Sequence, residues 1–115
     1  MTAAERRLIA YTTIAHALVH TIEVTYAVLL LRIQLEFGTG DVLMGVIASI
    51  FGWAFGATAI PAGFLTDRLG SRRVLYYTFV GATGAAVLVG LSPNQWFLAG
   101  ALALLGLAIG LYHPA

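Results

Sequence analysis

The chain has 115 residues, of which 60% are hydrophobic and 10% are charged, and its formal net charge is +1. Soluble domains usually carry about 25% charged residues, so this composition excludes an ordinary soluble protein and indicates a membrane protein. The small net charge gives no general attraction to nucleic acid, and the absence of cysteine excludes disulfides, thiol catalysis and cysteine-based metal sites.

Four apolar segments follow one another along the chain, and each has about the length that a membrane-spanning helix needs. We expect these spans at about residues 8–31, 42–65, 74–91 and 96–115. Glycine, proline and polar residues separate them, as is typical of turns. The sequence therefore predicts an all-α membrane protein with four transmembrane helices, and it leaves no room for a soluble domain.

Ionisable residues in the first span form a stripe. His16, His20 and Glu23 are spaced i, i+4 and i+7, which puts them on one helical face, and Tyr26 extends that face. Ionisable groups are costly inside a membrane and usually face a protein interior or a water-filled cavity. Three interpretations remain open: proton coupling or substrate binding in a cavity, a structural hydrogen-bond network between helices, and a metal site that lacks a recognisable fourth ligand.

The arginines predict the orientation of the chain. Arg6 and Arg7 precede the first span, whereas Arg68, Arg72 and Arg73 follow the second, so all five lie on one side of the membrane. By the positive-inside rule this side is the cytoplasm. We therefore expect an integral protein of the plasma (inner) membrane with a cytoplasmic N-terminus.

The charged segment after the second span, Gly63-Phe-Leu-Thr-Asp-Arg-Leu-Gly-Ser-Arg-Arg73, carries the most specific pattern in the chain. It resembles the signature loop of the major facilitator superfamily, G-x-L-a-D-R-x-G-R/K-R/K-R/K, which joins the second and third spans of that family. The matching positions are Gly63, Leu65, Asp67, Arg68, Gly70, Arg72 and Arg73. Ser71 replaces the first of the three terminal basic residues.

The resemblance implies a fold of twelve spans in two halves, of which this chain is an N-terminal fragment holding spans 1–4, with the remaining spans missing. It also implies that Asp67 acts as a conformational latch. Arg68, Arg72 and Arg73 would then be its ionic partners or anchors to anionic lipid. The alternative for the arginines is that they only determine topology.

The last apolar segment offers packing residues and one further candidate for the solute pathway. Gly106 and Gly110 form a face of small residues, as Gly52 and Gly56 do in the second span. The ending Tyr112-His113-Pro114-Ala115 resembles a subset of the same superfamily, which implies that His113 lines the pathway.

From these features we expect secondary active transport of a small solute by alternating access, coupled to an ion, most simply a proton. The partners are the solute, the coupling ion and the lipid bilayer, without nucleic acid or cofactor, and neither an enzyme nor a resident metal is expected. Import and export, by symport or antiport, stay open. Two alternatives are a complete four-span small multidrug exporter that acts as a dimer through Glu23, and a non-transporting membrane subunit.

Overall fold

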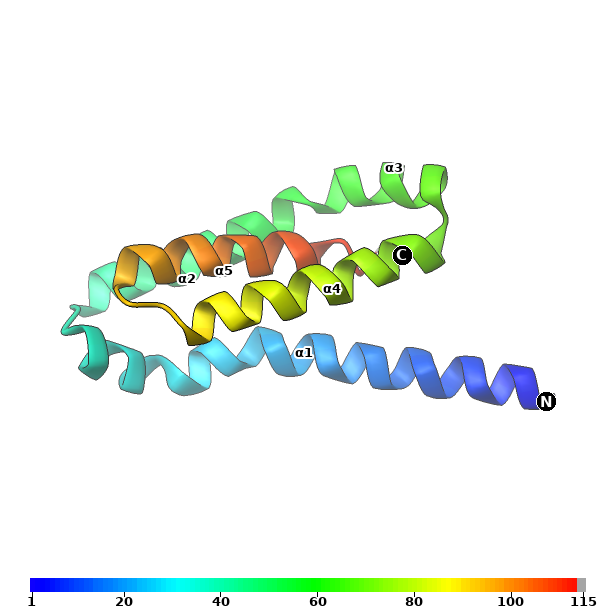
Figure 1. Ribbon diagram of the computed structural model, residues 1–115, viewed down its shortest axis with the longest axis horizontal. Helices are drawn as coiled ribbons and strands as arrows, with labels where there is room; N and C mark the ends of the chain where they lie inside the picture. Colours follow the sequence, from blue (N-terminus) through cyan, green and yellow to red (C-terminus); the bar gives the residue numbers. More distant parts are fainter. Residues whose placement is uncertain (114–115) are drawn as a thin grey trace. The chain divides into compact units, whose positions relative to one another are not determined.

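The protein is all-helical in the part that the computed structural model describes, residues 1–113, and no strand occurs there. The side chains of Tyr26 and Leu30 also lie outside the described part. In chain order the helices are α1 (Ala3–Phe37), α2 (Asp41–Ala57), α3 (Ala59–Leu69), α4 (Ser71–Gly90) and α5 (Gln95–Gly110) (Figure 1). The expected all-α class is confirmed.

The chain divides into two compact units, Met1–Leu31 and Arg32–Ala115. The first unit consists of the greater part of α1. The second contains the end of α1 and the helices α2 to α5. The packing of α2, α3, α4 and α5 against one another is therefore internal to the second unit.

Helix α5 lies between α2 and α4 and has more buried residues than any other helix in the described part of the second unit (Figure 1). Asn94 caps its N-terminus, because its side-chain oxygen accepts hydrogen bonds from the backbone N–H groups of Trp96 and Phe97, at 3.0 and 2.9 Å. The buried residues of α5 are Leu98, Ala99, Ala101, Leu102, Leu105, Gly106, Ile109 and Gly110. Half of them are alanine or glycine, which lets neighbouring helices approach closely.

Two glycines of α5 are places where the backbone of α2 comes too near for any side chain. A Cβ atom added at Gly106 would lie 2.6 Å from the carbonyl oxygen of Phe51, and one added at Gly110 would lie 2.6 Å from that of Phe55. The small-residue face expected on this helix therefore does pack. Gly52 and Gly56 of α2 differ, because a Cβ atom there would meet no atom within 4 Å in the described part of the chain.

The second apolar segment is interrupted at Thr58, where α2 ends and α3 begins. The Thr58 hydroxyl donates to the carbonyl oxygens of Ala54 and Phe55, at 3.1 and 2.8 Å. Pro61 then falls in the first turn of α3, where a backbone N–H has no helical partner and its absence costs little. Proline thus accounts for the position of the break.

A single residue, Gly70, joins α3 to α4, and the charged segment is not the open loop that its composition suggests. Gly70 adopts φ 81° and ψ 149°, a conformation that is essentially restricted to glycine. Asp67 and Arg68 lie in the last turn of α3, while Arg72 and Arg73 lie in the first turn of α4. The helices extend beyond the expected spans because glycine alone reverses the chain.

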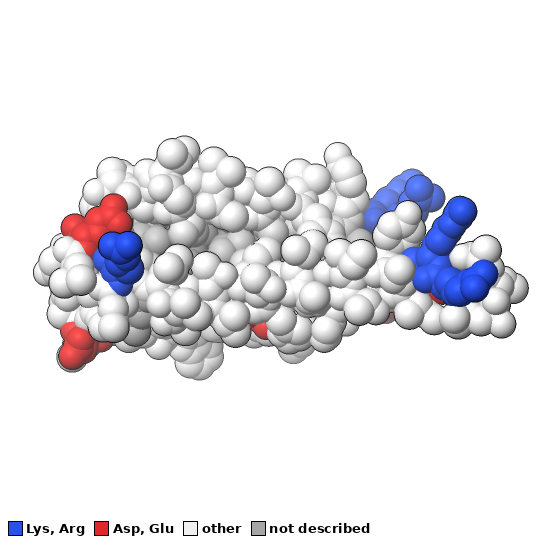
Figure 2. Space-filling model, turned by 90° about the horizontal axis from the view of Figure 1, so that it is seen from below, with Lys and Arg blue, Asp and Glu red and all other residues white. Residues whose placement is uncertain are grey.

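Charged residues of the second unit gather at its two ends. One end holds Arg32, Glu36 and Asp41 beside the turn between α1 and α2, where the Gln34 side chain donates to the Asp41 carboxylate at 2.6 Å. The other end holds the acid and the arginines around Gly70. Most of the molecular face that Figure 2 shows is formed by uncharged residues.

The lengths of the helices do not confirm the expected count of four membrane spans. Two helical stretches, Asp41–Leu69 and Ser71–Gly90, are long and apolar enough to cross a membrane, and α1 is a third if Ala3–Leu29 and Leu31–Phe37 count as one span. Helix α5 has 16 residues and is shorter than the expected segment 96–115, because its helix ends at Gly110. The last two residues of that expected segment lie outside the described ones.

Candidate functional site

The stripe of ionisable side chains in α1 forms a connected hydrogen-bonded array, which we call the histidine–glutamate array (His16, His20 and Glu23). Nδ1 of His20 lies 2.6 Å from Oε2 of Glu23, and Nε2 of His20 lies 3.1 Å from Nε2 of His16. The two imidazole rings meet edge to face, with centroids 4.4 Å apart. His20 therefore stands in the middle and uses both of its ring nitrogens.

The helical spacing explains why these three side chains meet. Residues three and four apart are neighbours on a helix surface, and the array uses one contact of each kind. Other polar side chains of α1 are satisfied within the helix: the hydroxyls of Thr21 and Thr25 donate to the carbonyl oxygens of Ala17 and Thr21, at 2.8 and 2.6 Å. The array thus groups the ionisable side chains in the middle of the helix.

The chemistry of the array follows from the way its hydrogens can be arranged. Between the Nε2 atoms of His16 and His20, one nitrogen must donate and the other must accept. When His20 donates from Nδ1 to Glu23, its neutral ring can only accept at Nε2, so His16 must donate there. A proton gained at one end therefore changes the donor and acceptor roles at the other, which is the property of a proton relay.

The described side chains give no support to the metal interpretation of the stripe. No group of three or more His, Cys, Asp or Glu side chains within the described residues has the geometry to hold a metal ion. The nitrogens that would bind a metal at His20 are both directed at other members of the array. The structure therefore favours hydrogen bonding over the metal interpretation of the stripe.

Two other candidates from the sequence, Tyr26 and His113, are described separately from the array. The side chain of Tyr26 lies outside the described residues. His113 belongs to the second unit, just beyond α5, where its ring meets those of Phe55 and Tyr112 edge to face, with centroids 5.3 and 5.7 Å apart.

The signature segment, Gly63–Arg73, places its charges in solvent-facing positions at the joint between α3 and α4. Asp67, Arg68, Arg72 and Arg73 are exposed, and among the described residues none of them forms an ion pair. A Cβ atom at Gly63 would meet nothing within 4 Å, so no close helix contact requires this glycine in the described part of the chain. The latch role of Asp67 stays a prediction.

One contact in this segment is not predictable from the signature pattern. The guanidinium carbon of Arg68 lies 4.2 Å from the centroid of the Phe64 ring, a cation–π arrangement. Phe64 occupies a variable position of the pattern, so the pattern itself gives no reason to select it. The i, i+4 spacing of an aromatic residue and an arginine is the signal that could have found it.

Comparison with known proteins agrees with the signature segment. The family model of the Major Facilitator Superfamily matches residues 12–115. The D-galactonate transporter of Escherichia coli O6:H1 is 33% identical over 76 residues, which are 66% of this chain and 18% of that protein. The probable anion transporter 6 of Oryza sativa subsp. japonica is 37% identical over 79 residues, which are 68% of this chain and 18% of that protein.

A third relative matches a shorter stretch. The probable galactarate/D-glucarate transporter of Pseudomonas putida is 50% identical over 42 residues, which are 36% of this chain and 9% of that protein. The chain thus spans less than a fifth of the length of each of these relatives. No solved structure matches it significantly.

Proposed function

Because the chain belongs to the major facilitator superfamily, we propose that it supplies the first four spans of a secondary active transporter. It is an integral membrane protein, as its family and its apolar helices indicate. Its relatives are transporters and not enzymes. In the proposed protein these spans form part of one half of the transporter, which alternates between inward-facing and outward-facing states.

The proposed solute is a small organic anion, of which sugar acids are the first class to test. Three relatives support this: one is named for D-galactonate, one for galactarate and D-glucarate, and one for an anion. The array in α1 offers chemistry for such a solute, because a protonated imidazole donates hydrogen bonds to a carboxylate. The remaining ligands for the anion would come from spans beyond these residues.

The proposed driving force is a proton gradient, and the histidine–glutamate array is the observation that carries this part of the proposal. His20 is hydrogen-bonded to Glu23 at 2.6 Å and to His16 at 3.1 Å. Protonation at one end of the array therefore changes the hydrogen bonding at the other end. Ionisable groups inside membrane spans are the usual components of proton pathways in transporters. Glu23 is the acid of this proposed pathway.

The test uses the complete transporter that contains these residues, reconstituted in liposomes with an imposed pH gradient and labelled D-galactonate, galactarate or D-glucarate. The wild-type protein should accumulate the sugar acid against its gradient. Glu23→Gln should abolish accumulation but keep solute exchange at equal pH, because the proton carrier is lost and the pathway is not. Glu36→Gln, which removes an exposed acid near the end of the same helix, is the control and should keep both.

Two results of this experiment would count against the proposal in different ways. Normal proton-driven accumulation by Glu23→Gln would remove the array from the coupling mechanism. Failure of the wild-type protein to move any of the three sugar acids would remove the proposed substrate class. The alternative of a small multidrug exporter is not supported, since the family that matches is a different one.

The proposed orientation, with the N-terminus in the cytoplasm of an inner membrane, has its own test. Because these 115 residues contain no cysteine, a single introduced thiol reports on one position in a cysteine-free transporter. Ser71→Cys, beside the arginines, should be shielded from an impermeant maleimide in intact cells. Glu36→Cys should be labelled, because it lies at the opposite end of the second unit. The reverse labelling pattern would invert the orientation.

A further inference from the structure

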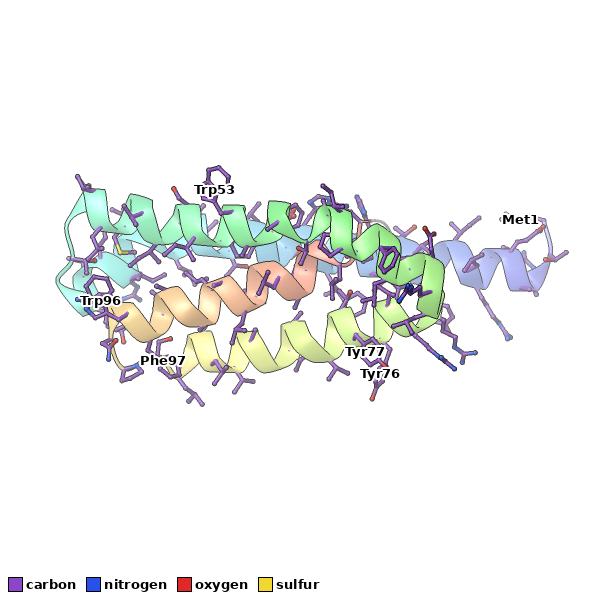
Figure 3. All side chains as sticks on the ribbon, turned by 90° about the horizontal axis from the view of Figure 1, so that it is seen from above. Met1, Trp53, Tyr76, Tyr77, Trp96 and Phe97 are labelled. Carbon is purple, nitrogen blue, oxygen red and sulfur yellow. The ribbon has the colours of Figure 1, made fainter. Side chains whose placement is uncertain are left out.

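A shallow groove runs along one face of α4. It has a volume of about 640 Å³ and is lined by Arg72, Leu75, Tyr76, Phe79, Val80 and Thr83. These residues recur every three or four positions and so follow a single stripe of the helix. Tyr76 stands on the side of α4 that faces away from α5 and α2 (Figure 3). The groove is thus on the outer side of the second unit.

The groove is polar at one end only. Arg72 lies in the first turn of α4 and forms no ion pair among the described residues, and Tyr76, 66% exposed, lies one turn further along. Beyond these two, the lining is apolar as far as Thr83. The hydroxyl of Thr83 already donates to the carbonyl oxygen of Phe79 at 2.7 Å, so it requires no outside partner.

The length of the groove matches one leaflet of a bilayer. The step from Arg72 to Thr83 is 11 residues, which rise about 16 Å along a helix. The hydrocarbon core of a membrane is about 30 Å thick, so one leaflet contributes about 15 Å. Helix α4 is itself long and apolar enough to cross a membrane. A cation at the interface followed by one leaflet's depth of apolar surface is complementary to a phospholipid with an anionic headgroup.

We propose that this groove binds an anionic phospholipid of the leaflet on the Arg72 side, with the phosphate at Arg72 and Tyr76 and an acyl chain along Leu75, Phe79 and Val80. Guanidinium and phosphate form charge-assisted, frequently bidentate hydrogen bonds, and tyrosine favours the interface. This site goes beyond solute transport; it requires that α4 spans the membrane and that the groove faces the lipid in the complete transporter.

The test measures lipid bound to the purified complete transporter by native mass spectrometry after titration with dioleoyl phosphatidylglycerol or dioleoyl phosphatidylcholine. The wild-type protein should hold phosphatidylglycerol in preference to phosphatidylcholine. Arg72→Gln should weaken phosphatidylglycerol binding about fivefold, since each basic residue near the surface contributes about that factor. Arg73→Gln removes the same charge one residue away, outside the groove, and should bind as the wild type does.

A second pair of variants tests the groove without changing charge. Val80→Trp should fill it and displace the lipid, whereas Val87→Trp, at a similarly exposed position of the same helix outside the groove, should leave binding unchanged. Val80 is 54% exposed and Val87 is 55% exposed, so neither substitution disturbs the core. Unfolding temperatures of the four variants should agree with that of the wild type.

Four outcomes would overturn the proposal. If Arg72→Gln and Arg73→Gln weaken phosphatidylglycerol binding equally, the binding comes from general electrostatic attraction between the protein and anionic lipid. Full binding by Val80→Trp would place the lipid elsewhere. Equal binding of phosphatidylglycerol and phosphatidylcholine would show that the groove does not select an anionic lipid. A cross-link from Val80→Cys to another helix or to a second copy of the protein would show that the groove is covered and that no lipid occupies it.

Discussion

Gly110 of α5 lies directly against Thr58, at the break between α2 and α3. Gly110→Ala should lower the free energy of unfolding by about 1–3 kcal/mol, because the added Cβ atom would meet the Thr58 side chain and the carbonyl oxygen of Phe55. Thermal unfolding of the complete transporter in detergent measures this. The control is Gly100→Ala in the same helix, where an added Cβ atom would meet nothing within 4 Å. This substitution should raise the free energy of unfolding by about 0.5–1 kcal/mol, because alanine favours the helix over glycine. Equal unfolding temperatures of the two variants would mean that α2 and α5 are less closely packed.

Gly70→Ala tests the joint between α3 and α4. The backbone conformation of Gly70, φ 81° and ψ 149°, should make alanine cost about 1–3 kcal/mol, and Gly70→Asn should be no better tolerated. Gly63→Ala is the matched control, because Gly63 is inside α3 and its surroundings are open. The measurement is thermal unfolding together with the transport rate. If Gly70→Ala and Gly63→Ala had the same unfolding temperature and transport rate, the joint between α3 and α4 would not require the backbone conformation of Gly70.

The contact between Phe64 and Arg68 should be measurable as a coupling energy. A double-mutant cycle with Phe64→Leu and Arg68→Gln should give about 0.5–1 kcal/mol, the strength of a cation–π pair at an exposed site. The readout is the change in unfolding free energy of the two single variants and the double variant. If the two substitutions prove additive, Phe64 does not position Arg68.

Within the histidine–glutamate array, the two histidines should not be equivalent. His20→Ala removes both hydrogen bonds of the array, whereas His16→Ala removes one and leaves the 2.6 Å contact between His20 and Glu23. We expect His20→Ala to lower proton-driven uptake about 10²-fold and His16→Ala to have a clearly smaller effect. Thr21→Val, which changes a polar neighbour outside the array, is the control. Equal losses for the two histidines would argue against a relay centred on His20.

Thr78 should be a site where a substitution increases stability. Its side chain is fully buried on α4, and its hydroxyl has no hydrogen-bond partner in the described part of the protein. Thr78→Val keeps the shape and removes the unsatisfied group, so it should raise the unfolding free energy by about 1–3 kcal/mol. Thr83→Val, which removes a satisfied hydroxyl on the same helix, should not be stabilising. Destabilisation by Thr78→Val would reveal a partner for that hydroxyl in the rest of the transporter.

The parts of this structure that sequence could predict are those that depend on residues close together in the chain. The contacts of His16, His20 and Glu23 follow from helical spacing, and the cap at Asn94 follows from its residue type and position before an apolar run. The reversal at the charged segment is predictable as well, although its reduction to Gly70 alone is not. Local geometry decides all of these.

The parts that sequence could not predict depend on which helix faces which. Gly52 and Gly56 have the same spacing as Gly106 and Gly110, yet only the α5 pair packs against another helix in the described part of the chain. Nothing in either motif tells the two apart, because a small-residue face identifies a surface and not its partner. The break at Thr58 belongs here too, since a proline in an apolar span fits either a kink or a helix start.

The glycines of α5 have one more consequence. At Gly106 and Gly110 the backbone of α5 lies against backbone atoms of α2, and at Gly81 α4 lies close to the Cβ atom of Ala108 in α5. At these three contacts no long side chain lies between the helices that could change rotamer and absorb a displacement. A displacement of α2 would therefore be transmitted through α5 to α4 almost unchanged. In a transporter that works by rocking one bundle of helices against another, we expect α2, α4 and α5 to move together as one rigid body.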